Sequence, residues 1–332
     1  MDLSTLTTHL RGLKGVAHKL DIRPVRDLIA AAGPSGTLNA VPVGDDCAAI
    51  PDGAGGHLLF AIEGMLDEFV AAEPWFAGYC AVMVNVSDVY AMGGRPTAIV
   101  DALWTASADR AGPVWAGMAA AAAKYGVPIV GGHTNSRASG DHLAAAVLGR
   151  AGPRLLTSFD ARPGDALVVA VDLRGEWFGP YPYWNASTNA PGDRLRGDLG
   201  LLPGLAEDGL CRAAKDVSMG GLVGTAAMLA ECSGVGVTMD VSAVPVPPGV
   251  RMEKWLSAFP SYGFLMAADP RNVLQIRSRF AARGIAAAAA GSFDASGRVA
   301  LTDRTGVREE FWDLRRAGFI GFGPPSRPEG HP

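Results

Sequence analysis

Two short segments of the sequence combine adjacent or helically spaced acidic and amide residues with glycine. The first is Gly44-Asp-Asp-Cys-Ala-Ala49, in which two neighbouring carboxylates follow a glycine that permits a tight turn. The second is Asn85-Val-Ser-Asp-Val-Tyr-Ala-Met-Gly-Gly-Arg-Pro96, where Asn85 and Asp88 share one face of a predicted helix. Carboxylates, phosphate oxygens and water are the ligands that magnesium prefers. Both segments therefore indicate a metal site; the alternatives are a solvated turn in the first and an exposed helix face in the second.

A third segment could approach phosphate through its backbone. Val130-Gly-Gly-His-Thr-Asn135 directly follows a predicted strand, and Gly131 and Gly132 would let the chain come close to a ligand and present amide donors. His133 is also compatible with an ordinary turn histidine. It is nevertheless the best candidate for a general base in this sequence.

The fourth segment is Ala214-Lys-Asp-Val-Ser-Met-Gly-Gly-Leu222. It places Asp216 and Ser218 just ahead of a predicted helix, whose positive N-terminal end would face them and any phosphate bound there. Either residue could instead simply cap the helix, a role that is compatible with ligand binding.

Composition and motif content exclude several other classes of protein. The 332 residues carry a net charge of −4 with scattered Lys and Arg, so no basic stripe indicates a nucleic-acid partner. The sequence lacks the Walker A, G-x-G-x-x-G, H-E-x-x-H and G-x-S-x-G motifs. Neither a signal peptide nor a membrane span is expected, and the widely spaced cysteines are typical of a cytoplasmic protein. These are Cys47, Cys80, Cys211 and Cys232.

The elements that must position these segments fall into two α+β halves. We expect a helical lead-in over residues 1–36, a first domain over 1–155, a second over 156–323 and a tail over 324–332. In the first half the periodicity predicts strands at 57–62, 97–103, 127–130 and 142–148 and helices at 75–92 and 114–125. The second half repeats this mixture of strands and helices, with predicted helices around 201–214 and 219–232.

In order and spacing the segments resemble the superfamily of aminoimidazole ribonucleotide (AIR) synthetase, selenophosphate synthetase and thiamine monophosphate kinase. Residues 44–49 resemble its G-D-D-A-A element, residues 85–96 its N-x-x-S-D-x-x-A-M-G-G-x-P signature and residues 215–222 its D-V-[ST]-x-G-G-L element. The resemblance spans about residues 40–300. It implies an N-terminal α+β domain that dimerises by sheet pairing and a C-terminal α+β domain, with ATP and magnesium in the cleft between them.

The resemblance also implies roles for individual residues. The residues expected to hold magnesium are Asp45, Asp46, Glu63, Asp88 and Asp216, with Glu63 standing where relatives commonly have the shorter Asp. The residues expected to contact the nucleotide are Asn85, Gly131, Gly132, Thr134 and Ser218. The residues expected to be catalytic are Lys19 and His133.

The glycine-containing N-terminal segment separates this chain from one branch of the superfamily. Selenophosphate synthetases carry a reactive Cys or selenocysteine there, whereas Gly15-Val-Ala-His-Lys-Leu20 has none. Lys19 matches the family's active-site lysine, a cation that could stabilise charge on a transferring phosphoryl group; the alternative is an ordinary exposed helix lysine.

Residues 175–189 are unusually aromatic, with two Trp, two Tyr and a Phe. They could form a packed Ω-loop or a dimer contact, or a substrate lid that stacks on a planar ring.

The acidic segments and the resemblance together predict an enzyme that uses ATP and Mg²⁺ to phosphorylate an oxygen of a small molecule, either as a kinase or to activate that oxygen for dehydration or ring closure. The resemblance also implies that the enzyme is a homodimer. The alternative is a nucleotide-binding accessory subunit that has lost catalysis.

Overall fold

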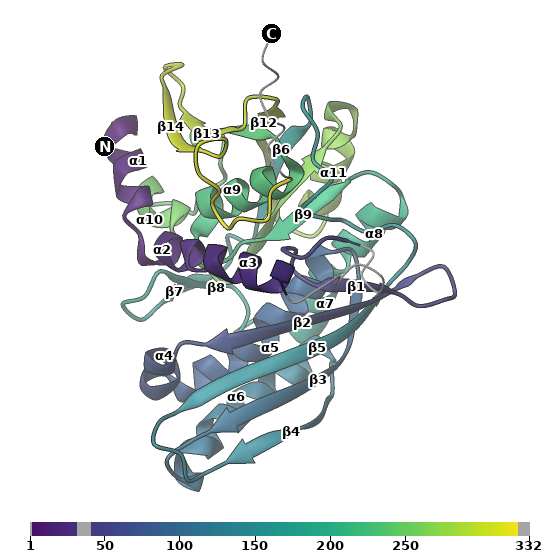
Figure 1. The fold of residues 1–332 in the computed structure, drawn as a ribbon, viewed down its shortest axis with the longest axis vertical. Coiled ribbons are helices and arrows are strands. Elements are labelled where there is room, and N and C mark those ends of the chain that lie inside the picture. Colours follow the sequence, from purple (N-terminus) through teal and green to yellow (C-terminus); the bar gives the residue numbers. More distant parts are fainter. Residues whose placement is uncertain (1, 32–40, 325–332) are drawn as a thin grey trace.

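The computed structural model describes residues 2–31 and 41–324. The chain forms two α+β halves, each built on one β-sheet with helices packed against it (Figure 1). The N-terminal half has a five-stranded sheet in the order β1-β2-β5-β3-β4, in which only β3 and β4 run parallel. Its elements are β1 (Ala48–Pro51), β2 (His57–Met65), α4 (Asp67–Ala72), α5 (Pro74–Ala91), β3 (Arg95–Trp104), α6 (Ala108–Tyr125), β4 (Ile129–Asn135) and β5 (His142–Ala151).

Helix α5 is the central element of this half and is buried on nearly every side. It contacts the sheet and α6, and two glycines allow the two helices to pack closely. A Cβ atom on Gly78 would lie 2.1 Å from the carbonyl oxygen of Val114, and one on Gly117 would lie 1.8 Å from that of Trp75. The close packing fixes the position of the α5 face that carries Asp88.

The opposite face of the five-stranded sheet is exposed and apolar. Neighbouring residues of a strand point to opposite faces, so on β3 Ile99 and Leu103 are buried under the helices while Val100 is 41% exposed. We call this surface the open face; its exposed apolar side chains are Phe60, Ile62, Val100, Val130 and Leu148.

The C-terminal half contains a seven-stranded sheet in the order β14-β13-β10-β12-β6-β11-β9, and β7 and β8 form a separate hairpin. Its strands are β6 (Ala166–Val171), β7 (Glu176–Phe178), β8 (Tyr183–Asn185), β9 (Ala213–Asp216), β10 (Gly236–Asp240), β11 (Gly263–Ala268), β12 (Ala286–Asp294), β13 (Arg298–Thr302) and β14 (Arg308–Asp313). Its helices are α7 (Gly192–Leu199), α8 (Leu201–Glu207), α9 (Gly221–Ser233), α10 (Met252–Leu256), the 3-10 turn η1 (Pro270–Asn272) and α11 (Val273–Ala281).

The two halves share buried side chains along β6 and β11, which are buried on both faces. Val168 of β6 packs with the core of the N-terminal half, whereas its neighbour Val169 packs with a second core that surrounds α9. A strand buried on both faces reads as a continuous apolar run, as Ala166–Val171 does. The continuous packing holds the residues of the two halves in fixed relative positions.

The N-terminal helices α1 (Leu3–Arg11), α2 (Lys14–Leu20) and α3 (Arg23–Ala31) precede the first sheet. Leu6 and Leu10 of α1 and Val16 of α2 belong to the core around α9, so α1 and α2 pack on the C-terminal half (Figure 1). Gly15 is essential to this contact, because a Cβ atom there would lie 1.9 Å from the carbonyl oxygen of Met219. The contact places α2 directly over the segment that follows β9.

The mixed α+β architecture in two halves confirms the predicted fold class. Two local predictions are wrong. The predicted helix around 201–214 ends with α8 at Glu207, and β9 begins at Ala213. The predicted strand at 127–130 is displaced, because β4 spans Ile129–Asn135 and includes the two glycines. The predicted tail, apart from residue 324, lies outside the described residues. No helix among the described residues is both long and apolar enough to cross a membrane.

Candidate metal and nucleotide site

Three aspartates from three separate elements meet between the two halves. Asp46 lies in the turn before β1, Asp88 on α5 and Asp216 at the end of β9, and each offers a carboxylate oxygen within 4.8 Å of the others. Asp88 and Asp216 are 6% and 4% exposed. The three acidic segments among the four singled out in the sequence therefore converge on one point.

The turn that carries Asp46 is held in place by its neighbours. Gly44 has a φ of 120°, a conformation that residues with a side chain rarely adopt, and a Cβ atom there would lie 2.5 Å from that of Phe322. Asp45 accepts hydrogen bonds from the backbone N–H of Ser158 at 2.8 Å and from its hydroxyl at 2.6 Å. Asp45 therefore anchors the turn to the connection between the halves, and Asp46 is the residue of the pair that faces the other carboxylates.

Lys215 is the buried counter-charge of the cluster. Its ammonium group forms an ion pair with Asp46, and both side chains are 6% exposed. Burial would lower the pKa of Lys215, but the carboxylates of Asp46 and Asp45 outweigh that effect and raise it above its ordinary value. The lysine therefore stays charged and compensates one of the carboxylates.

The remaining negative charge makes ionisation of the cluster unfavourable. Burial, together with the charge of Asp46, raises the pKa of Asp216 to about 7. Burial, Asp216 and Glu63 raise the pKa of Asp88 well above its ordinary range. Burial and the charge of Asp46 raise the pKa of Asp45 to about 6. Like charges held together in a buried place shift pKa values in this direction, and a bound cation would reverse the shift.

The donor set fits a hard divalent cation. Oδ2 of Asp46 and Oδ2 of Asp88 are buried and have no hydrogen-bond partner among the described atoms. Buried carboxylate oxygens without a partner are costly, and all the converging ligand atoms are oxygens, the type that magnesium selects. The geometry thus supports the predicted metal role of Asp46, Asp88 and Asp216.

A cavity of about 120 Å³ opens beside the cluster. Glu63 is solvent-exposed and lines it, and Lys19 of α2 reaches it because α2 packs on the segment after β9. Lys19 and Glu63 therefore line the same cavity as Asp88 and Asp216, and their roles as an active-site lysine and a further metal ligand stay predictions. The complete lining comprises Lys19, Glu63, Gly64, Met65, Leu66, Phe69, Cys80, Val84, Asp88, Tyr183, Asp216, Val217, Ser218, Met219, Phe259, Pro260 and Ser261.

Two serines complete the C-terminal wall of this cavity. Ser218 lines it with a buried hydroxyl that has no partner among the described atoms. Ser261 donates a hydrogen bond to Asp216 at 3.1 Å and has a φ of 47°, the left-handed region that is unfavourable for serine. Strained backbone of this kind is concentrated at functional sites.

Asn85 does not line this cavity. Its side-chain amide donates to the carbonyl oxygens of Ala81 at 2.8 Å and Ala145 at 3.0 Å, and so ties α5 to β5. These hydrogen bonds orient the helix that carries Asp88, and the predicted contact of Asn85 with the nucleotide stays a prediction.

The glycine-rich segment on β4 lies away from the cluster within one chain. Strands β5 and β3 separate β4 from β2, so at about 4.8 Å per strand His133 is about 14 Å from the strand of Glu63. Gly131, Gly132, His133 and Thr134 are all exposed, and none of them lines the cavity. The ring of His133 lies 5.7 Å from that of Trp104, which adjoins it on the sheet.

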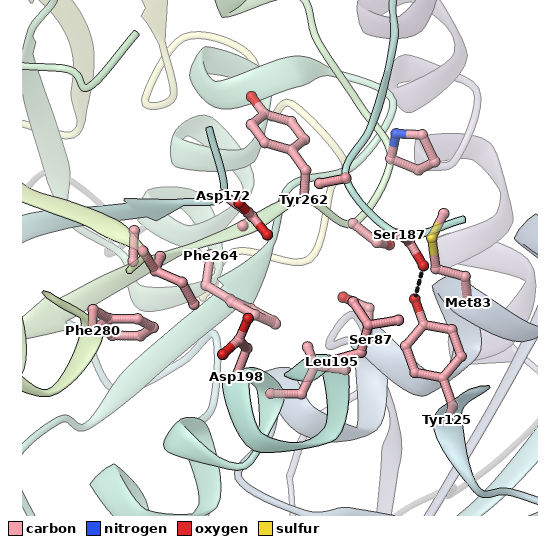
Figure 2. Close-up of a pocket in the computed structure, with 17 residues that line it drawn as sticks. Met83, Ser87, Tyr125, Asp172, Ser187, Leu195, Asp198, Tyr262, Phe264 and Phe280 are labelled. Atoms are coloured by element: carbon pink, nitrogen blue, oxygen red, sulfur yellow. Dashed lines mark hydrogen bonds between the residues drawn. The ribbon is translucent and has the colours of Figure 1, made fainter. Parts of the chain in front are cut away.

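Figure 2 shows a second cavity, of about 60 Å³, which shares Ser261 with the first. The hydroxyls of Ser187 and Tyr125 interact there at 2.7 Å, and those of Ser87 and Tyr262 have no partner among the described atoms. None of the clustered carboxylates lines it. Its hydroxyl-rich lining distinguishes it from the cavity beside Asp88.

Sequence reasoning assigned no role to Lys215 and Ser261. Lys215 follows two alanines and precedes an aspartate in the short segment Ala213–Asp216. A lysine buried in such a strand needs an acidic partner, so this pattern could have indicated an ion pair. Ser261 carries no comparable signal, since its contact with Asp216 depends on the loop that precedes β11.

Comparison with known proteins identifies the family of the chain. The family model described as AIR synthase related protein, N-terminal domain, matches residues 44–151, and the corresponding C-terminal domain model matches residues 193–304. An uncharacterised protein of Synechocystis sp. is 46% identical over 96% of this chain and 98% of its own length. A thiamine-monophosphate kinase of Caulobacter vibrioides is 27% identical, over 75% of this chain and 77% of its own.

Solved structures show the same fold. Thermotoga maritima PurL complexed with ATP aligns with a TM-score of 0.69 at 20% identity, over 88% of this chain and 47% of that one. AaThiL complexed with AMPPCP and TMP aligns with a TM-score of 0.65 at 19% identity, over 87% and 96%. The N-terminal domain model covers Asp46 and Asp88 and the C-terminal domain model covers Asp216, and the chain belongs to the AIR synthase related family.

Proposed function

We propose that this protein is a magnesium-dependent enzyme that transfers the γ-phosphoryl group of ATP to an oxygen of a small molecule. The observation that carries the proposal is the convergence of Asp46, Asp88 and Asp216, two of them with buried oxygens that lack partners. The names of relatives support the class of reaction, since they include a thiamine-monophosphate kinase and selenide, water dikinases.

In this proposal the protein contributes positioning and charge. Asp46, Asp88 and Asp216 would hold Mg²⁺, which when bound neutralises phosphate oxygens. Lys215 is committed to Asp46 by its buried ion pair, so Lys19 is the cation in the cavity that can approach the transferring phosphoryl group. Glu63 adds a fourth carboxylate at the exposed side, and Ser218 offers an unpartnered hydroxyl to the nucleotide or the acceptor.

We also propose that the protein is a homodimer formed through the open face. The five exposed apolar side chains on one sheet surface are more than isolated exposed residues and are typical of an interface. His133 would then lie near the dimer interface and not beside the carboxylates of its own chain. It lies next to Trp104 of β3, the strand that also carries Val100 of the open face.

The four cysteines are free and buried, which supports a cytoplasmic location.

Calorimetry and a turnover assay test the function. We expect ATP to bind only with Mg²⁺, and ADP to form when the correct acceptor is supplied from a panel of alcohols, amides, ribonucleotides and carboxylates. Asp88→Asn should abolish both results. Magnesium-dependent binding without turnover over the whole panel would favour the accessory-subunit hypothesis, and ATP binding without Mg²⁺ would contradict the proposal.

A further inference from the structure

The cavity beside the carboxylates has an aromatic and apolar end. The ring of Tyr183 packs edge-on against those of Phe69 at 5.1 Å and Phe259 at 4.9 Å, and all three residues line the cavity. Leu66 and Val84 line it as well. Rings and aliphatic side chains that surround an open space form a site for a planar or apolar group.

Tyr183 belongs to the aromatic segment 175–189, which the structure shows as the packed β7–β8 hairpin. Trp177 and Trp184 of this hairpin pack edge-on at 5.3 Å, and Trp184 packs against the buried Trp255 at 5.0 Å. The hairpin is therefore anchored on the C-terminal half. Tyr183 is a fixed wall of the cavity.

The aromatic end lies too close to the metal site to hold adenine. Val84 precedes Asp88 by four residues on α5, a rise of about 6 Å. In ATP, the ribose and the α-phosphate separate adenine from the β- and γ-phosphates that a metal binds. The group next to the γ-phosphate is instead the molecule that receives it.

The charges around the cavity restrict the acceptor further. Among the described residues that line it, Lys19 is the single cation, whereas Glu63, Asp88 and Asp216 are acidic. The side chain of Lys19 lies against the start of α9, because a Cβ atom on Gly220 would lie 3.8 Å from its Cγ atom. The aromatic end therefore has no cation of its own with which to bind a phosphate or carboxylate group.

We propose that the phosphoryl acceptor is a small neutral or cationic aromatic compound that carries a hydroxyl group, with its ring between Phe69, Tyr183 and Phe259. This inference rests on the proposed function. The hydroxyl oxygen forms a bond to the γ-phosphorus while the bond from that phosphorus to the bridging oxygen breaks. The bonding electrons leave with ADP, and the hydroxyl proton is released to solvent.

Binding of two probe molecules tests the inference directly. Benzyl alcohol represents the neutral acceptor and benzoate its anionic counterpart, each titrated in saturation-transfer NMR with Mg²⁺ and a saturating non-hydrolysable ATP analogue. Val84→Phe should fill the aromatic end and abolish the benzyl alcohol signal. Tyr183→Leu should weaken binding by about two- to tenfold, the range for loss of one aromatic contact.

A control variant comes from the same hairpin. Trp177→Leu shortens an aromatic side chain that does not line the cavity, so it should leave benzyl alcohol binding unchanged. Thermal unfolding of each variant establishes that it is folded. Benzoate should bind at least about tenfold more weakly than benzyl alcohol, because the aromatic end offers it no counter-charge.

The outcomes separate this inference from the proposed function. If Mg²⁺ and ATP do not bind at all, the proposed function fails. If they bind to the wild type and to Val84→Phe alike, but benzyl alcohol gives no signal or the same signal in both, the acceptor inference alone is overturned. Weaker nucleotide binding in both Val84→Phe and Tyr183→Leu would show that the cavity holds adenine, which also overturns the inference.

Discussion

Replacing Asp216 with asparagine should stabilise the metal-free protein and at the same time remove its response to magnesium and ATP. The pKa of Asp216 is raised from 3.8 to about 7 by burial and by the charge of Asp46. At about 1.4 kcal/mol for each pH unit, keeping this carboxylate ionised costs about 4 kcal/mol. Coulomb repulsion between two charges no more than 4.8 Å apart is itself at least about 3 kcal/mol at an effective dielectric constant of about 20.

The pH dependence of this gain follows from the direction of the pKa shift. The folded state holds the Asp216 proton more tightly than the unfolded state, so the wild type loses stability as pH rises between the two pKa values. The loss is absent below about pH 4 and complete above about pH 7. Asparagine does not ionise, so the advantage of the variant should be full at pH 8 and absent near pH 4.

Asp198→Asn provides the matched control, because it is the same substitution at another buried aspartate. Asp198 accepts hydrogen bonds from Arg174 at 2.7 Å and from Arg283 at 2.8 Å, and its side chain is 7% exposed. Removing its charge takes the carboxylate from Arg283 and leaves Arg174 with Asp172, its other carboxylate partner, alone. This variant should therefore lose about 1–3 kcal/mol, the opposite sign from Asp216→Asn.

Urea unfolding at pH 8 in EDTA measures both effects, and thermal unfolding with and without Mg²⁺ and ATP measures the ligand response. We expect Asp216→Asn to unfold at a higher urea concentration than the wild type and to gain nothing from the ligands. A variant that is less stable than the wild type at pH 8 would refute the electrostatic reasoning. A variant that is still stabilised by Mg²⁺ and ATP would refute the assignment of Asp216 as a ligand.

Four further substitutions test other parts of the account. Lys215→Met removes the buried partner of Asp46 and should cost about 3–5 kcal/mol in urea unfolding. Glu231→Ala should cost at least about 3 kcal/mol in the same assay, because its carboxylate accepts three backbone N–H groups of the C-terminal segment at 2.6–3.1 Å. Gly44→Ala should cost about 1–3 kcal/mol and weaken calorimetric binding of Mg²⁺ and ATP, since its φ of 120° strains any side chain. Ile62→Glu on the open face should convert a dimer to a monomer in light scattering, whereas an unchanged mass would contradict the sheet-paired dimer.

The most informative sequence prediction concerned Asp88. Asp88 stands among Val84, Val86, Val89 and Met92, so the predicted helix has no side that is wholly exposed to solvent, and an aspartate is unfavourable there. In the structure Asp88 is buried on α5. Local pattern alone was sufficient here, because the helical periodicity placed Asp88 on the same element as its apolar neighbours. The convergence of Asp88 with Asp46 and Asp216 required the resemblance, since it depends on contacts between the two halves.

Other features could not be predicted, because distant parts of the chain decide them. Asp45 and Asp46 are neighbours in the sequence, so local pattern does not distinguish their roles. The hydrogen bond between Asp45 and Ser158, 113 residues away, makes Asp45 the residue that anchors the turn. The two glycines before His133 suggested a loop end, but pairing with β3 keeps them in strand β4. Lys19 reaches the cavity only because Gly15 lets α2 pack against the backbone of Met219. Such tertiary contacts override local propensity.

A crystal structure with Mn²⁺ and a non-hydrolysable ATP analogue, analysed by anomalous scattering, tests the central claim most directly. The account predicts an anomalous peak at about 2.0–2.3 Å from oxygens of Asp46, Asp88 and Asp216, with phosphate oxygens completing the coordination. Nucleotide density elsewhere in the molecule, with no metal peak among these three carboxylates, would contradict it.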